Sequence, residues 1–150
     1  MGLVDDDGNL SYKEIVKIDD SNRNEEFIFS TIKDYVDKHS AEVEYVGIGV
    51  PGIVHNNEIV YTCNLPLKNV KVEDYIKTKK PLFVGNDALC ATLAEYHYID
   101  KRMYSNYALV AIGTGIGAGI ILNGNIYNGT TGTAGEVGHM VIEKDGIPCK

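Results

Sequence analysis

The sequence predicts an α/β fold, and three observations lead to this prediction. In the first hundred residues, short β-branched and aromatic runs alternate with segments of helical periodicity, which is typical of an α/β sheet. A β-branched run over 43–50 ends directly at Pro51-Gly52, as a buried strand entering a tight turn does. Near the end of the chain, Asn123-Gly124 stands between apolar strands, and this pair is a strong hairpin signal. The chain therefore begins as an α/β sheet and ends in a second, β-hairpin sheet.

The individual elements follow from periodicity and turn residues. In chain order we expect a β-hairpin (2–4 and 10–18), a helix from a capping box at 22–25 to about residue 38, strands at 43–50 and 58–62, a helical turn at 72–77, a strand at 81–84, a helix at 88–98, and strands at 107–112, 119–122 and 125–127. The long helix is predicted from apolar residues at helical spacing: Phe27, Ile28, Ile32, Tyr35 and Val36. The polar segment 100–106 is predicted to connect two parts of the fold.

Composition and charge exclude several classes of function. The chain has 150 residues, 44% of them hydrophobic and 23% charged, which is enough for a domain with a real core. Its net charge of −7 repels phosphate backbones and anionic lipid, so we expect no nucleic-acid or membrane partner for this part of the protein. Cys63, Cys90 and Cys149 are odd in number and widely spaced, which argues against a disulfide framework and favours the cytoplasm.

A glycine-rich segment, Gly113–Gly119, is the first candidate for binding chemistry. Glycines at this density let backbone N–H groups converge on an anion. Gly113, Gly115 and Ala118 also fit a dinucleotide fingerprint, but that motif opens a helix and here a strand follows. A Walker A loop is excluded because no Gly-Lys-Ser/Thr closes the segment. Phosphate binding and a plain tight β-turn remain as interpretations of comparable weight.

Two further motifs carry titratable groups. Asp87 stands at a strand-to-helix junction, where an aspartate is ordinarily an N-cap, but where a carboxylate could also accept the proton of an attacking hydroxyl. Glu136 and His139 lie in a glycine-framed loop, with Cys149 ten residues beyond the histidine. A histidine and a cysteine make half of a zinc site, and a structural histidine is the alternative.

Taken together, the order and spacing of these segments resemble the ROK family, which comprises bacterial sugar kinases and related sugar-responsive repressors. The matching segments are 46–52, 85–91, 113–124 and 135–139. The resemblance implies a two-lobed ribonuclease-H-like fold of the actin/hexokinase type, present here incompletely. On this basis the first lobe covers residues 1–103 and the second begins at 104–150.

The resemblance also implies roles for single residues. Asp87 matches the family's catalytic base. The positions that match sugar-hydroxyl contacts are Asn86, Asp87, Glu136 and His139; those that match the ATP-phosphate turn are Gly113, Thr114 and Gly115; those that match structural Zn²⁺ ligands are His139 and Cys149. The implied reaction is transfer of the γ-phosphoryl group of ATP, with Mg²⁺, to a hexose hydroxyl. The implied full-length protein is a homo-oligomer, most simply a dimer.

The chain departs from the family pattern at both ends. Family members open with a strand bearing Asp-x-Gly-Gly-Thr shortly before a segment like Gly-Leu-Val-Asp, which here is residues 2–5. We expect that strand to be absent, and its absence to leave a gap in the first sheet. Further zinc cysteines and the adenosine pocket are expected beyond Lys150. The prediction is a sugar kinase that is inactive as this piece, and the alternative is the sugar-sensing lobe of a ROK-type repressor.

Overall fold

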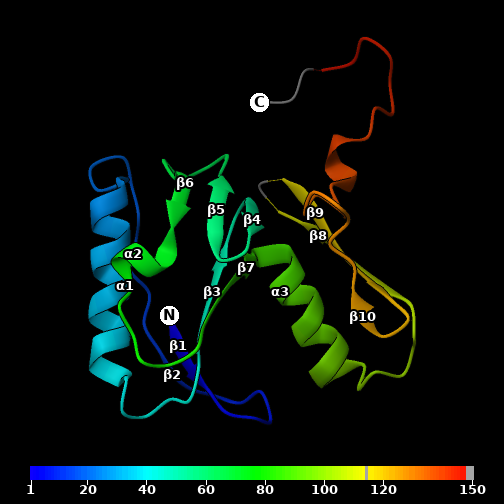
Figure 1. The fold of residues 1–150 in the computed structure, drawn as a ribbon. Coiled ribbons are helices and arrows are strands. Elements are labelled where there is room, and N and C mark those ends of the chain that lie inside the picture. The colour runs from blue at the N-terminus through cyan, green and yellow to red at the C-terminus, as the bar shows by residue number, and fades with distance from the viewer. Residues whose placement is uncertain (114, 148–150) are drawn as a thin grey trace. The chain divides into compact units, whose positions relative to one another are not determined.

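The computed structural model describes residues 1–113 and 115–147. The chain divides into two compact units, Met1–Cys90 and Ala91–Lys150, and each is described by itself. Figure 1 shows the order of their elements along the chain. The division falls within helix α3 (Asp87–Ala94). The predicted boundary between the lobes, after residue 103, refers to the complete two-lobed fold and not to this division, so it stays a prediction.

The first unit opens with the expected hairpin, in which β1 (Gly2–Val4) pairs antiparallel with β2 (Leu10–Lys13). The carboxylate of Asp5 organises the turn by accepting hydrogen bonds from the backbone N–H groups of Asp7 and Asn9, at 3.0 and 2.8 Å. The second strand is shorter than the predicted 10–18. Backbone bonds between Met1 and Glu14 extend the pairing by one residue, and the chain then leaves the hairpin and passes along α1.

Helix α1 (Glu25–His39) confirms the predicted helix but begins at a different cap. The N-cap is Asn24, whose side chain accepts a hydrogen bond from the N–H of Phe27 at 2.8 Å, rather than Asn22. A cap satisfies one of the backbone donors left free at a helix start. The buried face of α1 joins β-strand residues in one core, which comprises Ile28, Phe29, Val36, Val46, Val50, Ile59, Leu67, Val70, Val72 and Ile76.

Two small sheets complete the first unit. β3 (Val46–Val50) and β7 (Leu82–Asn86) are parallel, with five residues in register from Val46 opposite Leu82 to Val50 opposite Asn86. β4 (Ile53–His55), β5 (Glu58–Tyr61) and β6 (Lys68–Lys71) form an antiparallel sheet in the order β4-β5-β6, followed by the short helix α2 (Val72–Tyr75). Neither β4 nor β6 is predicted from the sequence.

The turn between β4 and β5 ties the two sheets together. Asn56 and Asn57 adopt positive φ angles of 50° and 60°, a conformation that asparagine tolerates better than most residues. The side-chain amide of Asn57 donates to the carbonyl of Leu82 and accepts from the N–H of Val84, each at 2.9 Å. One amide group thus satisfies two backbone groups along β7, as a short neighbouring strand would.

The second unit contains the rest of α3, a π-helical turn (Glu95–Ile99) and a three-stranded sheet. Its strands β8 (Tyr107–Ile112), β9 (Ile116–Leu122) and β10 (Asn125–Ile126) lie in the order β10-β9-β8, and a 3-10 turn, η2 (Val137–His139), follows. The Asn123-Gly124 hairpin is confirmed, with positive φ at both residues. Across the described ranges, no helix has the length and apolar character needed to span a membrane.

Gly119 determines how closely α3 packs on β9. A Cβ placed on Gly119 would lie 2.0 Å from Oγ1 and 2.6 Å from Cβ of Thr92, which is fully buried. No real Cβ is that close to a neighbour, so Gly119→Ala must push the helix away from the strand. We expect a loss of about 1–3 kcal/mol in the free energy of unfolding, measured by denaturant titration. Gly47→Ala is the control, because its Cβ would meet nothing within 4 Å. Equal stability of the two variants would contradict this packing.

Candidate active site

The first group of candidate residues lies where β3 and β7 end. Because these strands are parallel and in register, their carboxyl ends are level, and Pro51-Gly52 and Asn86-Asp87 leave the same edge of the sheet. Open α/β sheets bind their ligands at this edge. Asp87 is the first residue of α3, and it is exposed.

The structure assigns the capping role at this junction to Asn86 rather than to Asp87. The Asn86 side chain accepts a hydrogen bond from the N–H of Leu89 at 3.0 Å, so Asn86 caps α3. Its Nδ2 donates to the carbonyl of Gly52 at 2.9 Å, which ties the helix start to the turn after β3. The Asp87 carboxylate accepts a hydrogen bond from the adjacent N–H of Ala88, at 2.9 Å. The helix cap predicted at this junction is therefore Asn86, and Asp87 presents its carboxylate at the surface.

Two glycines lie opposite one another next to the start of α3. Gly49 of β3 pairs with Gly85 of β7. A Cβ on Gly49 would lie 3.7 Å from the Cα of Asp87, and a Cβ on Gly85 would lie 3.1 Å from the Sγ of Cys90. The first distance is an ordinary van der Waals contact, whereas the second is tight and would require the Cys90 side chain to shift by a few tenths of an ångström. Glycine at position 85 thus leaves room for the Cys90 thiol.

Cys90 lies beside this carboxylate but is a poor nucleophile. Partial burial raises the pKa of the Cys90 thiol, and the negative charge of Asp87 raises it further. A raised pKa leaves less thiolate at neutral pH, and the thiolate is the reactive form. The Cys90 thiol is therefore less reactive than that of an ordinary cysteine.

The second group belongs to the second unit and begins with the turn between β8 and β9. The N–H of Gly113 donates to the carbonyl of Gly115 at 2.9 Å, which closes the turn. A Cβ on either glycine would meet nothing within 4 Å, so the surroundings of this turn are open. Thr114, the predicted hydroxyl contact to phosphate, lies outside the described residues. The bond within the turn shows that the Gly113 N–H is already used, which leaves other groups of the segment for an anion.

Glu136 and His139 are brought together at η2. The carboxylate Oε2 of Glu136 and Nε2 of His139 are 3.7 Å apart, and their side chains are 46% and 61% exposed. The N–H of His139 also donates to the carbonyl of Glu136 at 3.1 Å. The two side chains thus present an acceptor and an imidazole on one exposed turn, a combination that suits neighbouring hydroxyl groups of a sugar.

Glycines hold this turn against β9, which the sequence pattern alone does not reveal. Gly135 has φ +91°, and a Cβ there would lie 2.3 Å from the carbonyl oxygen of Ala118. A Cβ on Gly138 would lie 2.4 Å from the carbonyl oxygen of Ile116. Only glycine permits either approach. The strand that leaves the Gly113–Gly115 turn therefore also positions Glu136 and His139.

The metal-binding prediction rests on one described ligand. The imidazole of His139 is 61% exposed, and imidazole nitrogen is a common zinc ligand. Cys149, the other predicted ligand, lies outside the described residues. Within 1–113 and 115–147, no three His, Cys, Asp or Glu side chains gather closely enough to hold a metal ion. One imidazole and one thiol fit half of a tetrahedral zinc site.

Comparison with known proteins shows the family. The sequence model of the ROK family matches residues 1–150. A glucokinase of Halalkalibacterium halodurans is 36% identical over 134 residues, which cover 81% of this chain and 41% of that protein. The xylose repressor of Bacillus subtilis is 35% identical over 107 residues, which cover 69% of this chain and 28% of the repressor.

Solved structures agree with this relationship. A ROK family glucokinase from Streptomyces griseus, in complex with glucose and AMPPNP, superposes with a TM-score of 0.83 at 28% identity, over 97% of this chain and 48% of that one. The ROK hexokinase from Thermus thermophilus gives 0.76 at 26% identity, over 96% and 50%. The chain spans half or less of the length of the relatives named here. The predicted ribonuclease-H-like fold of the actin/hexokinase type is confirmed in this partial form, and the chain belongs to the ROK family.

Proposed function

We propose that this chain carries the catalytic carboxylate, a phosphate-binding turn and part of the sugar site of an ATP-dependent hexose kinase. The supporting observation is the Asp87 carboxylate, which is exposed at the carboxyl end of a parallel sheet while Asn86 takes the capping role. Relatives named glucokinase support the sugar-kinase class, and the glucose and AMPPNP bound to the Streptomyces griseus enzyme support a sugar and ATP as ligands.

The proposed roles follow from the chemistry of each side chain. Asp87 accepts the proton of the sugar hydroxyl that attacks, which requires it within hydrogen-bond reach of that hydroxyl. Glu136 and His139 orient neighbouring hydroxyls, so that one faces the base. ATP with Mg²⁺ supplies the phosphoryl group and neutralises its charge. Gly113, Thr114 and Gly115 form the phosphate turn: the N–H of Gly113 closes the turn, while the N–H of Gly115 and the hydroxyl of Thr114 bind phosphate oxygens.

The test is a sugar screen on the full-length protein. ADP release is measured by a coupled assay with ATP, Mg²⁺ and glucose, mannose, fructose or N-acetylated amino sugars. We expect release that depends on at least one of these hexoses. ATP turnover that is the same with and without every sugar would contradict the proposal.

A sugar-sensing repressor lobe is the second candidate, favoured by the 35% identity to the xylose repressor of Bacillus subtilis. A sensor needs sugar contacts but no general base, so the presence of Asp87 favours the kinase. Sequencing the gene upstream of the codon for Met1 separates the two. A short lead with Asp-x-Gly-Gly-Thr indicates the kinase, and a basic helix-turn-helix indicates the repressor.

The zinc prediction is tested by metal analysis. We expect about one zinc per subunit in the full-length protein, because a closed structural site needs four ligands, and His139 and Cys149 would supply two of them. The 150-residue chain should lack tight binding, since it offers only half of that set. His139→Ala in the full-length protein should lower the zinc content, whereas His55→Ala, an exposed histidine in β4, should leave it unchanged. Stoichiometric, chelator-resistant zinc in the 150-residue chain would contradict the assignment.

A further inference from the structure

The hairpin of β4 and β5 lies beside β7 but belongs to another sheet. In the residues that the structure describes, the backbone of β7 pairs with β3, and that of β4 pairs with β5. β4 nevertheless runs close to β7. It begins at Ile53, directly after Gly52, and its far end leads into the turn at Asn56-Asn57. Contacts other than a backbone ladder must therefore hold the hairpin against β7.

Two asparagine amides make these contacts, one at each end of the hairpin. At the turn, the side chain of Asn57 donates to the carbonyl of Leu82 and accepts from the N–H of Val84, each at 2.9 Å. At the base, Nδ2 of Asn86 donates to the carbonyl of Gly52, also at 2.9 Å. The first amide binds the beginning and middle of β7, and the second belongs to its last residue. Together they fix how far β7 extends relative to the hairpin.

The amide of Asn57 stands at a position where glycine is the usual residue. Asn56 and Asn57 lie between the paired residues His55 and Glu58, and their φ angles of 50° and 60° are those of a type I′ turn. Asn-Gly is a preferred sequence for this turn, because glycine adopts a positive φ without steric cost. A glycine at position 57 would thus suit the turn at least as well. What asparagine adds there is the pair of bonds to β7.

The strand that Asn57 holds is the strand that leads into the proposed base. Val84 precedes Asp87 by three residues, and β7 ends at Asn86. A β-strand is nearly extended, so a shift along its axis reaches its end with little loss. The Asp87 carboxylate accepts a hydrogen bond from the N–H of the next residue, Ala88, which moves with it. The location of the carboxylate therefore follows that of β7.

We propose that Asn57 is a positioning residue for phosphoryl transfer: through β7, its amide sets where the carboxylate of Asp87 lies. The inference rests on the proposed function, in which Asp87 is the base. Asn57 itself touches neither sugar nor ATP in this role. A general base acts only within hydrogen-bond reach of the proton that it takes, and a misplacement of about 1 Å lowers a rate by about a hundredfold.

Asn57→Gly in the full-length protein is the central test. It gives the turn its preferred Asn-Gly sequence and removes only the amide, so the hairpin should still form. We expect the turnover number to fall by about 10–100-fold, and the Michaelis constant for the sugar to change by less than about threefold, because the base acts in the chemical step. Asn56→Gly, a change at the exposed neighbour in the same turn, is the matched control and should keep normal turnover. Normal turnover of Asn57→Gly would overturn the inference.

A double-mutant cycle with Asp87 separates positioning from a general loss of structure. In the Asp87→Asn protein the base is gone, so adding Asn57→Gly should lower turnover by less than about twofold more. Losses that multiply would show that Asn57 acts independently of Asp87, which overturns the inference alone. Normal turnover of Asp87→Asn, or the absence of sugar-dependent turnover in the unmodified protein, would refute the proposed function and this inference with it.

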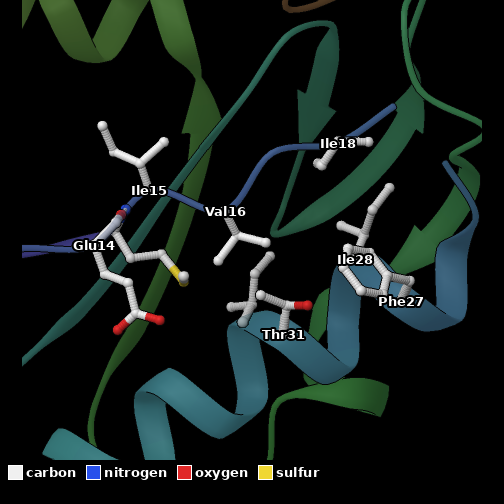
Figure 2. A pocket seen from close by; sticks show the side chains of 9 residues that line it. Glu14, Ile15, Val16, Ile18, Phe27, Ile28 and Thr31 are labelled. Carbon is white, nitrogen blue, oxygen red and sulfur yellow. Dashed lines mark hydrogen bonds between the residues drawn. The ribbon is translucent and has the colours of Figure 1, made fainter. Parts of the chain in front are cut away.

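A variant in a different part of the first unit controls for stability. Figure 2 shows a cavity of about 220 Å³ between α1 and residues 14–18, with Ile28 in its wall. Its lining residues all lie between Met1 and Ile32, away in sequence from the hairpin and β7. Ile28 is 6% exposed, so Ile28→Val should lower the thermal midpoint by a few degrees but leave turnover unchanged. If Ile28→Val lost as much turnover as Asn57→Gly, reduced stability would explain both, and the inference would be wrong.

Hydrogen exchange checks the bonds of Asn57 without any measurement of activity. The amide of Val84 should exchange at least about tenfold faster in Asn57→Gly than in the unmodified protein, because its acceptor is gone. The amide of Leu89, which is bonded to the side chain of Asn86, should exchange at nearly the same rate in both proteins. Unchanged exchange at Val84 would show that Asn57 does not hold β7 in solution, and it would overturn the inference.

Discussion

Asp87→Asn in the full-length protein is expected to lower the turnover number by roughly 10²–10⁴, the usual contribution of a positioned general base. The substitution keeps the size of the side chain and its bond to the N–H of Ala88, but it removes the group that takes the proton. Thermal stability should barely change, because Asn86 rather than Asp87 caps α3, and asparagine and aspartate cap helices about equally well in any case. Steady-state kinetics and thermal unfolding of the same preparation check both halves of the prediction.

Two further variants test whether the loss of turnover is specific to the carboxylate of Asp87. Asn86→Ala removes the cap and the bond to Gly52, so it should lower the free energy of unfolding by about 1–2 kcal/mol, which Asp87→Asn should not do. Asp34→Asn, an exposed carboxylate on α1, should affect neither turnover nor stability. Near-normal turnover of Asp87→Asn would remove Asp87 from the chemistry and leave it a surface residue of the helix start.

The sequence predicts those parts of the fold in which local pattern and tertiary packing agree. Residues 107–112 are predicted and found as a strand, because an apolar run there is bounded by a polar connection and a glycine turn. The strand β6 is not predicted, since its Lys-Asn-Val-Lys pattern buries only Val70 and owes its conformation to pairing with β5. The helix predicted at 88–98 continues to Ile99, but its last turn is π-helical, with the N–H of Asp100 bonded to the carbonyl of Glu95. The conformation of β6 depends on a separate strand, and the π-helical turn depends on backbone geometry. Hydrophobic periodicity reveals neither of them.

The candidate site shows the same limit. Asp87, Glu136 and His139 are proposed from residue type and motif, because chemistry restricts which side chains can serve. The groups that hold these side chains in place are of another kind. Asn86 donates a hydrogen bond to the carbonyl of Gly52, and Gly135 and Gly138 lie against carbonyls of β9. These carbonyls are backbone groups, which no sequence motif specifies. In the sequence, Gly52, Gly135 and Gly138 are recognisable only as glycines. Which atoms each glycine approaches follows from the fold.

The 150-residue chain by itself is expected to phosphorylate no sugar. It covers 48% of the glucokinase that binds glucose and AMPPNP. It carries the proposed base, one proposed phosphate turn and the Glu136–His139 turn, whose side chains are largely open to solvent. Phosphoryl transfer depends on positioning and charge neutralisation in a site that excludes water, so exposed groups alone supply little of the rate enhancement.

A coupled ADP-release assay with glucose, mannose, fructose and N-acetylated amino sugars measures this, with the full-length protein as the positive control. We expect no sugar-dependent ADP release above the rate without enzyme. Light scattering on the same sample establishes the mass, because β1 and β3 each pair with one strand only within residues 1–113 and 115–147, and an open strand edge favours association with other strands. Sugar-dependent turnover by a monomer of this chain would contradict the prediction that the site is incomplete in these 150 residues.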